Sequence, residues 1–549
     1  MVRRPWWRSR LSISVLGTAL LGTALAACSS GSGAAKGTGS GTTGPSTGHV
    51  LTVGTFDGHT GKYRTIQDAV DAARRGDWIL VAPGDYHETA DETSPSTSTD
   101  HGRFGGVLIT TSDIHLRGMD RGTVIVDGTK AGSATPCGSA PAQQNLGVVG
   151  SDGKAIGRNG IVVWKADNVS IENLTACNFL SGTGDSGNEI WWNGGADSGL
   201  IGMQGYTGRY LTATSTYYQG EATAAQYGIF SSNAQGPGSW DQIYASNFND
   251  SGMYVGACHQ VCDMTINHAW MEFSALGYSG TNSGGAIVIE NSQFDNNKDG
   301  VDTNTQIDGD APAPQNGACP GNAKSPITHT HSCWVFIHNS VHDNNNPNVP
   351  QAGSASAGPT GTGMTVSGGT NDTVMNNTFS NNGAWGVLFV PYPDSNPPVL
   401  GQTCAGTGGV QLTGFGCVYD PKGDALLDNT FTHDGYFANQ SNADFGQIVI
   451  NGDGARNCYA GNTAPVGSAP AGLEQSQPTC DGASAVSNTG GALLGQVLCD
   501  TGIGTCPAGS QYPQLTVISM HPVPATLPSM PNPCQGVPDN AWCPGGRPA

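Results

Sequence analysis

The sequence reads Gly228-Ile229-Phe230-Ser231, then Gly252-Met253-Tyr254-Val255, Gly277-Tyr278-Ser279-Gly280 and Gly300-Val301-Asp302-Thr303. The steps between these glycine-led units are 24, 25 and 23 residues. Fixed periods of this size mark solenoid folds, in which each unit stacks on the next. The units are too short for two helices, and each holds two or three β-type runs separated by Gly and Asn. We therefore expect one unit to form one coil of a β-solenoid.

A second phrase follows at the same pitch, first as Ile266-Asn267-His268-Ala269-Trp270-Met271 and then as Ile289-Glu290-Asn291-Ser292-Gln293-Phe294. It returns at 338–342, 375–379 and 427–431, where the spacing exceeds one coil. The excess length predicts inserted loops, and loops of a solenoid often lie on its working face.

The charge balance limits the partners. The chain of 549 residues has 22 basic and 42 acidic residues, a formal charge of −20. Nucleic acid is not an expected partner, because phosphate binding needs a basic surface. Between residues 190 and 460 the basic residues are Arg209, Lys298, Lys324, Lys422 and Arg456.

The N-terminus has the pattern of a targeting segment. Four arginines precede an apolar run from Leu11 to Ala27, which ends in Leu25-Ala26-Ala27-Cys28. This ending resembles a bacterial lipoprotein signal, which implies cleavage before Cys28 and a lipid on its thiol. The alternative is an ordinary secretory peptide with an incidental cysteine. Either way we expect an exported protein; the lipoprotein reading adds a cell-surface location with membrane contact only through the lipid.

Cysteine usage supports export. Without Cys28, 14 of the 15 cysteines remain, an even number typical of oxidising compartments. Sequence alone does not fix the connectivity, and pairing of sequence neighbours is a hypothesis. A metal site at Cys258 and Cys262 is the alternative for that pair. The neighbours are 137/177, 258/262, 319/333, 404/417, 458/480, 499/506 and 534/543.

Four segments are expected in order: a signal peptide (1–27), a Gly/Ser/Thr-rich linker (28–49), the β-solenoid (50–462) and a Pro/Gly/Cys-rich tail (463–549). The solenoid opens with a short helix, because Ile66, Ala69, Val70 and Ala73 share one helical face and Thr65 can cap it. In the tail, the apolar run 492–498 could cover the far end of the solenoid.

The opening of the solenoid carries a family resemblance. The segments Thr65–Val70, Gly76-Asp77 and Ile79–Tyr86 resemble the start of right-handed parallel β-helix proteins of the pectate-lyase-like superfamily. The resemblance covers roughly residues 50–462. It implies an all-β, right-handed parallel β-helix with a short N-terminal capping helix. It says little about activity, since one fold carries many functions.

The glycine-led units place Phe230, Tyr254, Ser279 and Asp302 in one column, because side chains alternate along a strand. Two aromatic rings, a hydroxyl and a carboxylate suit a glycan, whose faces stack on rings and whose hydroxyls bind the acid. The alternative is a solvated or loop-covered sheet face.

Asn297-Lys298-Asp299-Gly300-Val301-Asp302 is similar to a signature of polygalacturonase-like glycoside hydrolases. The resemblance implies that Asp299 is a catalytic carboxylate and Asp302 its nearby partner, since glycoside hydrolysis needs two carboxyls. The other motifs of that family are absent. A uronate lyase would instead use Lys298 as its base. The alternative is structural: a ladder of stacked Asn side chains from coil to coil, in which Asn297 would take part.

The second phrase suggests that Glu290 and His338 are neighbours, a carboxylate beside an imidazole that could tune a general base. Paired charges also occur on sheets without function. No cofactor is certain. Ca²⁺ is possible at Asp308-Gly309-Asp310 or Asp453, although exposed turns contain Asp and Gly for backbone reasons as well.

Two functions remain open. The first is a surface-anchored protein that binds polysaccharide or cell-wall glycan and cleaves it as a hydrolase or a lyase. The second is a non-catalytic glycan-binding or structural β-helix. We expect a monomer in both cases. The substrate cannot be read from the sequence.

Overall fold

The computed structural model describes residues 48–89, 105–195, 203–256, 258, 262–305, 315–353, 355–393, 404, 409–412, 416–450, 456–476, 491–502 and 505–545. The signal peptide, Cys28 and most of the linker lie outside these ranges, as do the acidic stretches 308–310 and Asp453. The expectations for lipidation and for Ca²⁺ at those stretches therefore stay predictions.

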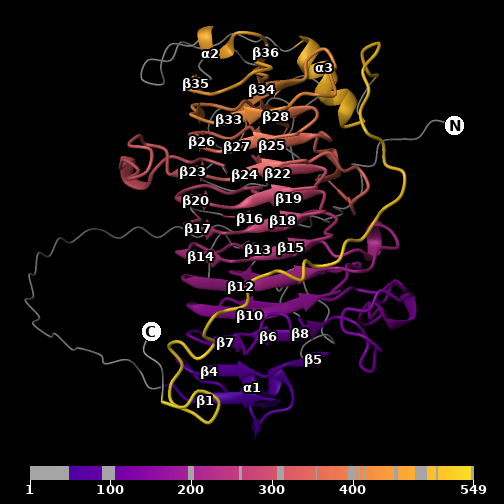
Figure 1. Cartoon of the computed structure of the whole chain (residues 1–549), viewed down its shortest axis with the longest axis vertical. Coiled ribbons are helices and arrows are strands. Elements are labelled where there is room, and N and C mark those ends of the chain that lie inside the picture. Colours follow the sequence, from indigo (N-terminus) through magenta and orange to yellow (C-terminus); the bar gives the residue numbers. More distant parts are fainter. Residues whose placement is uncertain are drawn as a thin grey trace, which may run out of the picture. The chain divides into compact units, whose positions relative to one another are not determined.

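The chain folds as a right-handed parallel β-helix, as expected. Over the described residues, its strands form an 11-stranded and a 20-stranded parallel sheet, and successive coils stack in chain order from indigo to orange (Figure 1). The 11-stranded sheet holds β6 (Val107–Ile109), β9 (Ile161–Trp164), β11 (Asn188–Asn193), β13 (Tyr227–Ser232), β16 (Ser251–Gly256), β19 (Leu276–Ser279), β22 (Asp299–Asn304), β25 (Thr362–Ser367), β28 (Trp385–Val390), β34 (Ala443–Gln447) and β36 (Ser468–Ala469).

The 20-stranded sheet receives two strands from most coils. It holds β1 (Val50–Val53), β4 (Trp78–Val81), β5 (Gly84–Tyr86), β7 (His115–Gly118), β8 (Val124–Asp127), β10 (Val169–Cys177), β12 (Tyr206–Thr214), β14 (Gly238–Asp241), β15 (Tyr244–Ser246), β17 (Met264–Asn267), β18 (Trp270–Glu272), β20 (Ile287–Glu290), β21 (Gln293–Asp295), β23 (Trp334–Ile337), β24 (Ser340–His342), β26 (Asp372–Met375), β27 (Thr378–Ser380), β32 (Ala425–Leu427), β33 (Thr430–Thr432) and β35 (Cys458–Ala460). Short antiparallel pairings join β2 (Thr55–Phe56) to β3 (His59–Thr60), and β31 (Gly416–Tyr419) to both β29 (Tyr392–Pro393) and β30 (Gly409–Leu412).

One residue in the left-handed region turns the chain between the paired strands of a coil. His268, Asn291 and His338 take this position with φ of 50°, 49° and 56°. Asn tolerates such a φ better than most residues, which explains the recurrence of Asn in the second phrase. The register pairs Glu290 with Ile337, so the prediction that Glu290 and His338 share a column is wrong by one residue. Asn291 and His338 occupy the same corner of successive coils, so the similar letters Glu-Asn-Ser at 290–292 and His-Asn-Ser at 338–340 match one position out of register.

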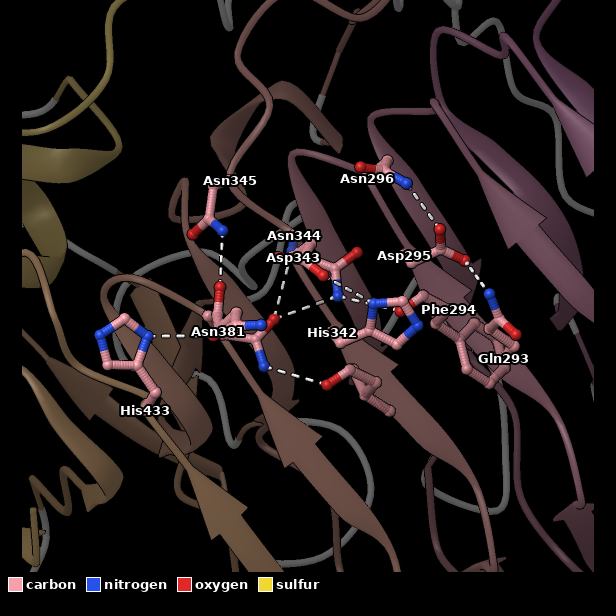
Figure 2. A network of polar contacts seen from close by, with 12 residues as sticks. Gln293, Phe294, Asp295, Asn296, His342, Asp343, Asn344, Asn345, Asn381 and His433 are labelled. Carbon is pink, nitrogen blue, oxygen red and sulfur yellow. Dashed lines mark hydrogen bonds and ion pairs between the residues drawn. The ribbon is translucent and has the colours of Figure 1, made fainter. Parts of the chain in front are cut away.

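A ladder of amide side chains runs through the interior beside β22. The side-chain oxygen of Asn344 accepts from the backbone N–H and the Nδ2 of Asn297, at 3.2 and 3.0 Å. Asn382 accepts in the same way from Asn344, and Asp434 from Asn382. Figure 2 shows this region, with Asn344 beside the corner residue Asn381 on the neighbouring coil. The structural interpretation of Asn297 is thereby confirmed, because each buried amide needs these partners.

The capping helix is α1 (Ile66–Ala72). Thr65 Oγ1 accepts from the Asp68 N–H at 3.1 Å, as expected for an N-cap. Ile66, Ala69 and Val70 are buried in the main core. The buried Glu88 carboxylate adds a second cap, since it accepts from the Ile66 N–H at 2.7 Å. The helix therefore covers the apolar first coil.

The far end is organised differently from the expectation. Parallel pairing continues past residue 462 to β36, and Leu473 of the helix α2 (Leu473–Ser476) lies in the main core. The helix α3 (Gly491–Asp500) contains the apolar run 492–498. Leu493 packs with Trp385 and Leu388, which point outward from β28. The run thus covers the outer face of the 11-stranded sheet rather than the open end.

The tail returns along the β-helix as an extended strap, defined here as residues 513–545 (yellow in Figure 1). Its contacts run against coil order, from Asn348 through Asn247, Asn173 and Arg117 to His59. Near its end, Val537 and Trp542 pack on Leu80 and Met119, on the outside of the first coils. The strap therefore ties distant coils to one another.

Disulfides form as the neighbour hypothesis predicted for six pairs. The thiols of Cys258 and Cys262 are joined to each other, so they are not metal ligands. The seventh pair includes Cys480, which lies outside the described ranges. This many disulfides is typical of proteins outside the reducing cytosol. In the described ranges, every helix is too short or too polar to cross a bilayer.

Candidate functional site

The outer face of the 11-stranded sheet contains the column that the sequence predicted. The register places Phe230 beside Tyr254, Tyr254 beside Ser279, and Ser279 beside Asp302. The alternate residues of the same strands, such as Met253 and Val301, are fully buried in the core. The column therefore points away from the interior.

The aromatic end of this face is closed on itself. Phe230 stacks on Trp191 and on Tyr254, with centroids 4.8 and 4.7 Å apart, and Tyr254 stacks on Tyr227 at 5.1 Å. Only 6% of Phe230 and 7% of Tyr254 is exposed. The ring faces are already in contact with one another, so the expected stacking of a sugar on these two faces does not fit. The tyrosine hydroxyls are engaged as well, since Tyr254 donates to the Thr281 carbonyl at 3.0 Å and Tyr227 donates to Asp250 at 3.2 Å.

Asp302 lies at the polar end of the column and is half-buried. It accepts hydrogen bonds from Thr365 Oγ1 at 2.5 Å, Ser367 Oγ at 2.8 Å and Asn304 Nδ2 at 3.0 Å. Burial raises the pKa of Asp302 above its ordinary value, and these three donors offset part of the rise by stabilising the charged form. The donors hold the carboxylate in one orientation.

A second carboxyl, Asp250, was missed by the sequence reasoning. It directly precedes β16, is half-buried, and accepts from the Tyr227 hydroxyl at 3.2 Å. Burial is the main reason that the pKa of Asp250 is raised to about 7, and the negative charge of Asp302 raises it further. The sequence did contain a signal, because Asp250 stands two residues before Gly252, the first residue of its glycine-led unit. Lys298 holds the equivalent position before Gly300, two coils later.

Asp250 and Asp302 together can transfer protons. Near neutral pH, Asp250 is a carboxyl poised between its two forms, which suits a general acid. Asp302 is held by three donors that favour its ionised form. Pairs of acids with different environments of this kind divide the acid and base roles.

The other two residues of the predicted catalytic motif are sealed. Asp299 has no exposed surface, and both its oxygens are buried without a hydrogen-bond partner in the part of the chain that the structure describes. Lys298 is 5% exposed and donates to the carbonyls of Ser356 and Gly358. Burial raises the pKa of Asp299 well above its ordinary value. The structure does not present Asp299 or Lys298 to a ligand.

Glu290 and His338 belong to the other sheet. Glu290 ends β20 and is half-buried, and His338 is an exposed corner residue. They are therefore separate from the column of Asp302, and they do not pair with each other in the register.

Another acidic column lies on the 20-stranded sheet. The register places Glu272 beside Asp295. It also places Asp295 beside His342, and Figure 2 shows these two residues. Burial raises the pKa of Glu272 to about 7. Only 4% of Glu272 and 3% of Asp295 is exposed, so this pair is less accessible than Asp250 and Asp302.

A cavity of about 290 Å³ brings together two of the few basic residues. Lys422 and Arg456 line it with polar side chains of Asn316, Thr370 and Asn371. Both cations are exposed. The cavity can therefore accept an anionic group. No motif in the sequence predicted this site.

No protein-family model and no curated protein matches the sequence. Among solved structures, the chain is similar to the A-module of mannuronan C-5 epimerase AlgE4 from Azotobacter vinelandii, at 13% identity over 72% of this chain and 90% of that one, with a TM-score of 0.44. It is also similar to an alginate lyase from a Paenibacillus species, at 12% identity over 77% and 96% of the two chains, with a TM-score of 0.33. Pectin methylesterase PemA from Erwinia chrysanthemi matches at 13% identity over 73% and 92%, with a TM-score of 0.31. These likenesses are too distant to carry an argument about activity.

Proposed function

We propose that the protein binds polysaccharide on the outer face of the 11-stranded sheet and hydrolyses a glycosidic bond there with Asp250 and Asp302. The observation that carries the proposal is the pair itself: two half-buried carboxyls whose charges interact, one with a pKa of about 7 and the other held by three donors. Neighbouring coils lie about 4.8 Å apart, so a linear glycan can span several of them.

The roles follow from the protonation states. Asp250 gives its proton to the oxygen of the leaving sugar. Asp302 supplies negative charge on the other side of the bond, where it activates a water molecule or attacks the sugar carbon. Tyr227 donates to Asp250 at 3.2 Å and stabilises its carboxylate after the proton has left.

Hydrolysis is favoured over elimination. A uronate lyase needs an accessible base, usually Lys or Arg, and Lys298 is buried with its ammonium group bound to two carbonyls. Asp250 and Asp302 need no such base. Lys422 and Arg456 could still bind an acidic group of the polysaccharide at their cavity, away from the reacting bond.

The setting of this activity is the cell surface. The expected signal peptide and lipid on Cys28 would hold a monomeric β-helix outside the membrane, at the end of the linker 28–49. Six disulfides agree with an exported protein. A bound Ca²⁺ is not needed for the roles given to Asp250 and Asp302.

A non-catalytic glycan-binding protein is the second candidate. The burial of Asp299, which the hydrolase resemblance makes a catalytic carboxylate, favours it. The absence of the remaining hydrolase motifs also favours it.

The test is a polysaccharide panel assayed for both binding and release of reducing ends. Asp250→Asn and Asp302→Asn should each lose at least about 100-fold in turnover and keep binding, because general acid–base catalysis contributes about 10²–10⁴-fold. Asp299→Asn, on the same strand but sealed, is the matched control and should stay active. Binding without turnover in the wild type would establish the second candidate, and no binding at all would exclude both.

A further inference from the structure

A cluster of three ligand-type side chains lies near the N-terminal end, outside the site described above. Asp85 is in β5, His87 follows that strand, and Asp127 ends the neighbouring strand β8. One ligand atom from each residue lies within 4.8 Å of the other two. His87 Nε2 and Asp85 Oδ2 are 3.2 Å apart. That spacing is close to the edge of a tetrahedron with metal–ligand bonds of about 2.0–2.1 Å, which is roughly 3.3 Å.

The imidazole of His87 is oriented as a metal ligand. Its Nδ1 lies 2.9 Å from the Thr129 carbonyl oxygen. A carbonyl only accepts, so Nδ1 carries the hydrogen, and Nε2 faces the two carboxylates. Metal-binding histidines usually donate their other N–H to a carbonyl or a carboxylate in this way, which fixes the ring.

Asp127 is fixed in the same manner. It is fully buried and accepts from the backbone N–H groups of Thr129 and Cys137, both at 2.7 Å. The Cys137–Cys177 disulfide anchors this turn. A rigid, buried carboxylate needs little rearrangement to bind an ion.

Thr129 supplies an independent observation. Its backbone contacts both His87 and Asp127, and its hydroxyl is buried with no partner in the described ranges. An unsatisfied buried hydroxyl calls for an explanation such as an ion or its bound water. Asp85 keeps 27% of its side chain exposed, which leaves an approach from solvent.

We propose that Asp85, His87 and Asp127 bind one divalent transition-metal ion, of which Zn²⁺ is the best fit. One imidazole nitrogen and two carboxylate oxygens suit Zn²⁺ or Mn²⁺, whereas Ca²⁺ prefers six or more oxygens. With three protein ligands, water completes the coordination. The ion joins β5 to β8 and stabilises the first coils.

The test is titration of untagged, EDTA-treated full-length protein with Zn²⁺, Mn²⁺ and Ca²⁺ by calorimetry, with melting curves in parallel. Wild type should bind one Zn²⁺ per chain, bind Ca²⁺ at least tenfold more weakly, and melt at a higher temperature with Zn²⁺. His87→Gln and Asp85→Asn should each weaken Zn²⁺ binding at least tenfold. His59→Gln and Asp57→Asn change exposed residues of the same types and should bind as wild type does.

The melting temperature in EDTA separates lost binding from lost folding. Should His87→Gln fail to fold, the more exposed Asp85→Asn decides alone. The proposal is overturned if wild type binds no Zn²⁺, or if Asp85→Asn binds it as tightly as wild type. In either case His87 forms an ion pair with Asp85 and nothing more.

Discussion

Asp299 and Asp302 lie three residues apart on β22, yet their surroundings differ. Asp299 is sealed beside Gly358, and the charge of Asp500 from α3 acts on it. Asp302 is half-buried and has three hydrogen-bond donors. A carboxyl without donors in a dry site stays neutral, whereas one with donors can hold a charge. The difference favours a structural role for Asp299 and supports the chemical role that we propose for Asp302.

The largest expected effect is on turnover. Asp302→Asn should reduce hydrolysis at least about 100-fold, because it removes the negative charge opposite the leaving group. The melting temperature should change little, since an amide oxygen still accepts from Thr365 and Ser367. Kinetics on a bound polysaccharide measures the first effect and calorimetry the second. Unchanged kinetics would remove Asp302 from the mechanism.

At the buried residues Lys298 and Asp299, the expected effect is on the free energy of unfolding. Lys298→Met leaves the carbonyls of Ser356 and Gly358 without their ammonium donor. Leaving a polar group without its partner in a buried site costs about 1–3 kcal/mol. Lys324→Met, at an exposed lysine, is the matched control. A melting temperature equal to that of the control would mean that the contacts of Lys298 with Ser356 and Gly358 do not stabilise the fold.

Asp299→Asn should be nearly neutral for stability at pH 7. Burial raises the pKa of the Asp299 carboxyl well above its ordinary value and so favours the uncharged form, which an amide of similar shape resembles. We expect a change of less than about 1 kcal/mol, within the range of substitutions that break no network. Thermal melting of this variant beside Lys298→Met measures the contrast directly. A loss as large as that of Lys298→Met would show that Asp299 is charged.

A small, pH-dependent effect is expected at the end of the amide ladder. Burial raises the pKa of Asp434 to about 7, above its unfolded value of about 3.9. The folded state therefore holds this proton more tightly, and the contribution is full below about pH 4 and falls as pH rises through 7. Asp434→Asn should raise stability by roughly 1 kcal/mol at pH 8 and less at pH 5. Melting curves at both values check the sign; equal shifts would contradict it.

The sequence predicted the fold because the period of the units and the capping segment are local signals. The column of Phe230, Tyr254, Ser279 and Asp302 followed from the same period and is confirmed. The pairing of Glu290 with His338 failed because Asn291 and His338 hold the same corner, whereas the similar letters around Asn291 and Asn339 suggest a match one position away.

The burial of Asp299 could not be predicted for a different reason. Its cover comes from Gly358, 59 positions later, and from α3, some 200 positions later, and no local pattern reports such contacts. Asp250 was missed because it belongs to no motif, and its raised pKa depends on burial by the folded chain and on the charge of Asp302 from another coil.

The pH dependence of turnover tests the central claim most directly. With Asp250 as the general acid, hydrolysis by the wild-type protein should fall as pH rises through about 7, because the proton to be donated is lost. Asp250→Asn should lack activity across the range, and Asp299→Asn should follow the wild-type profile. Turnover that continues unchanged above pH 8, or that survives in Asp250→Asn, would contradict the assignment of Asp250 and Asp302 as the catalytic pair.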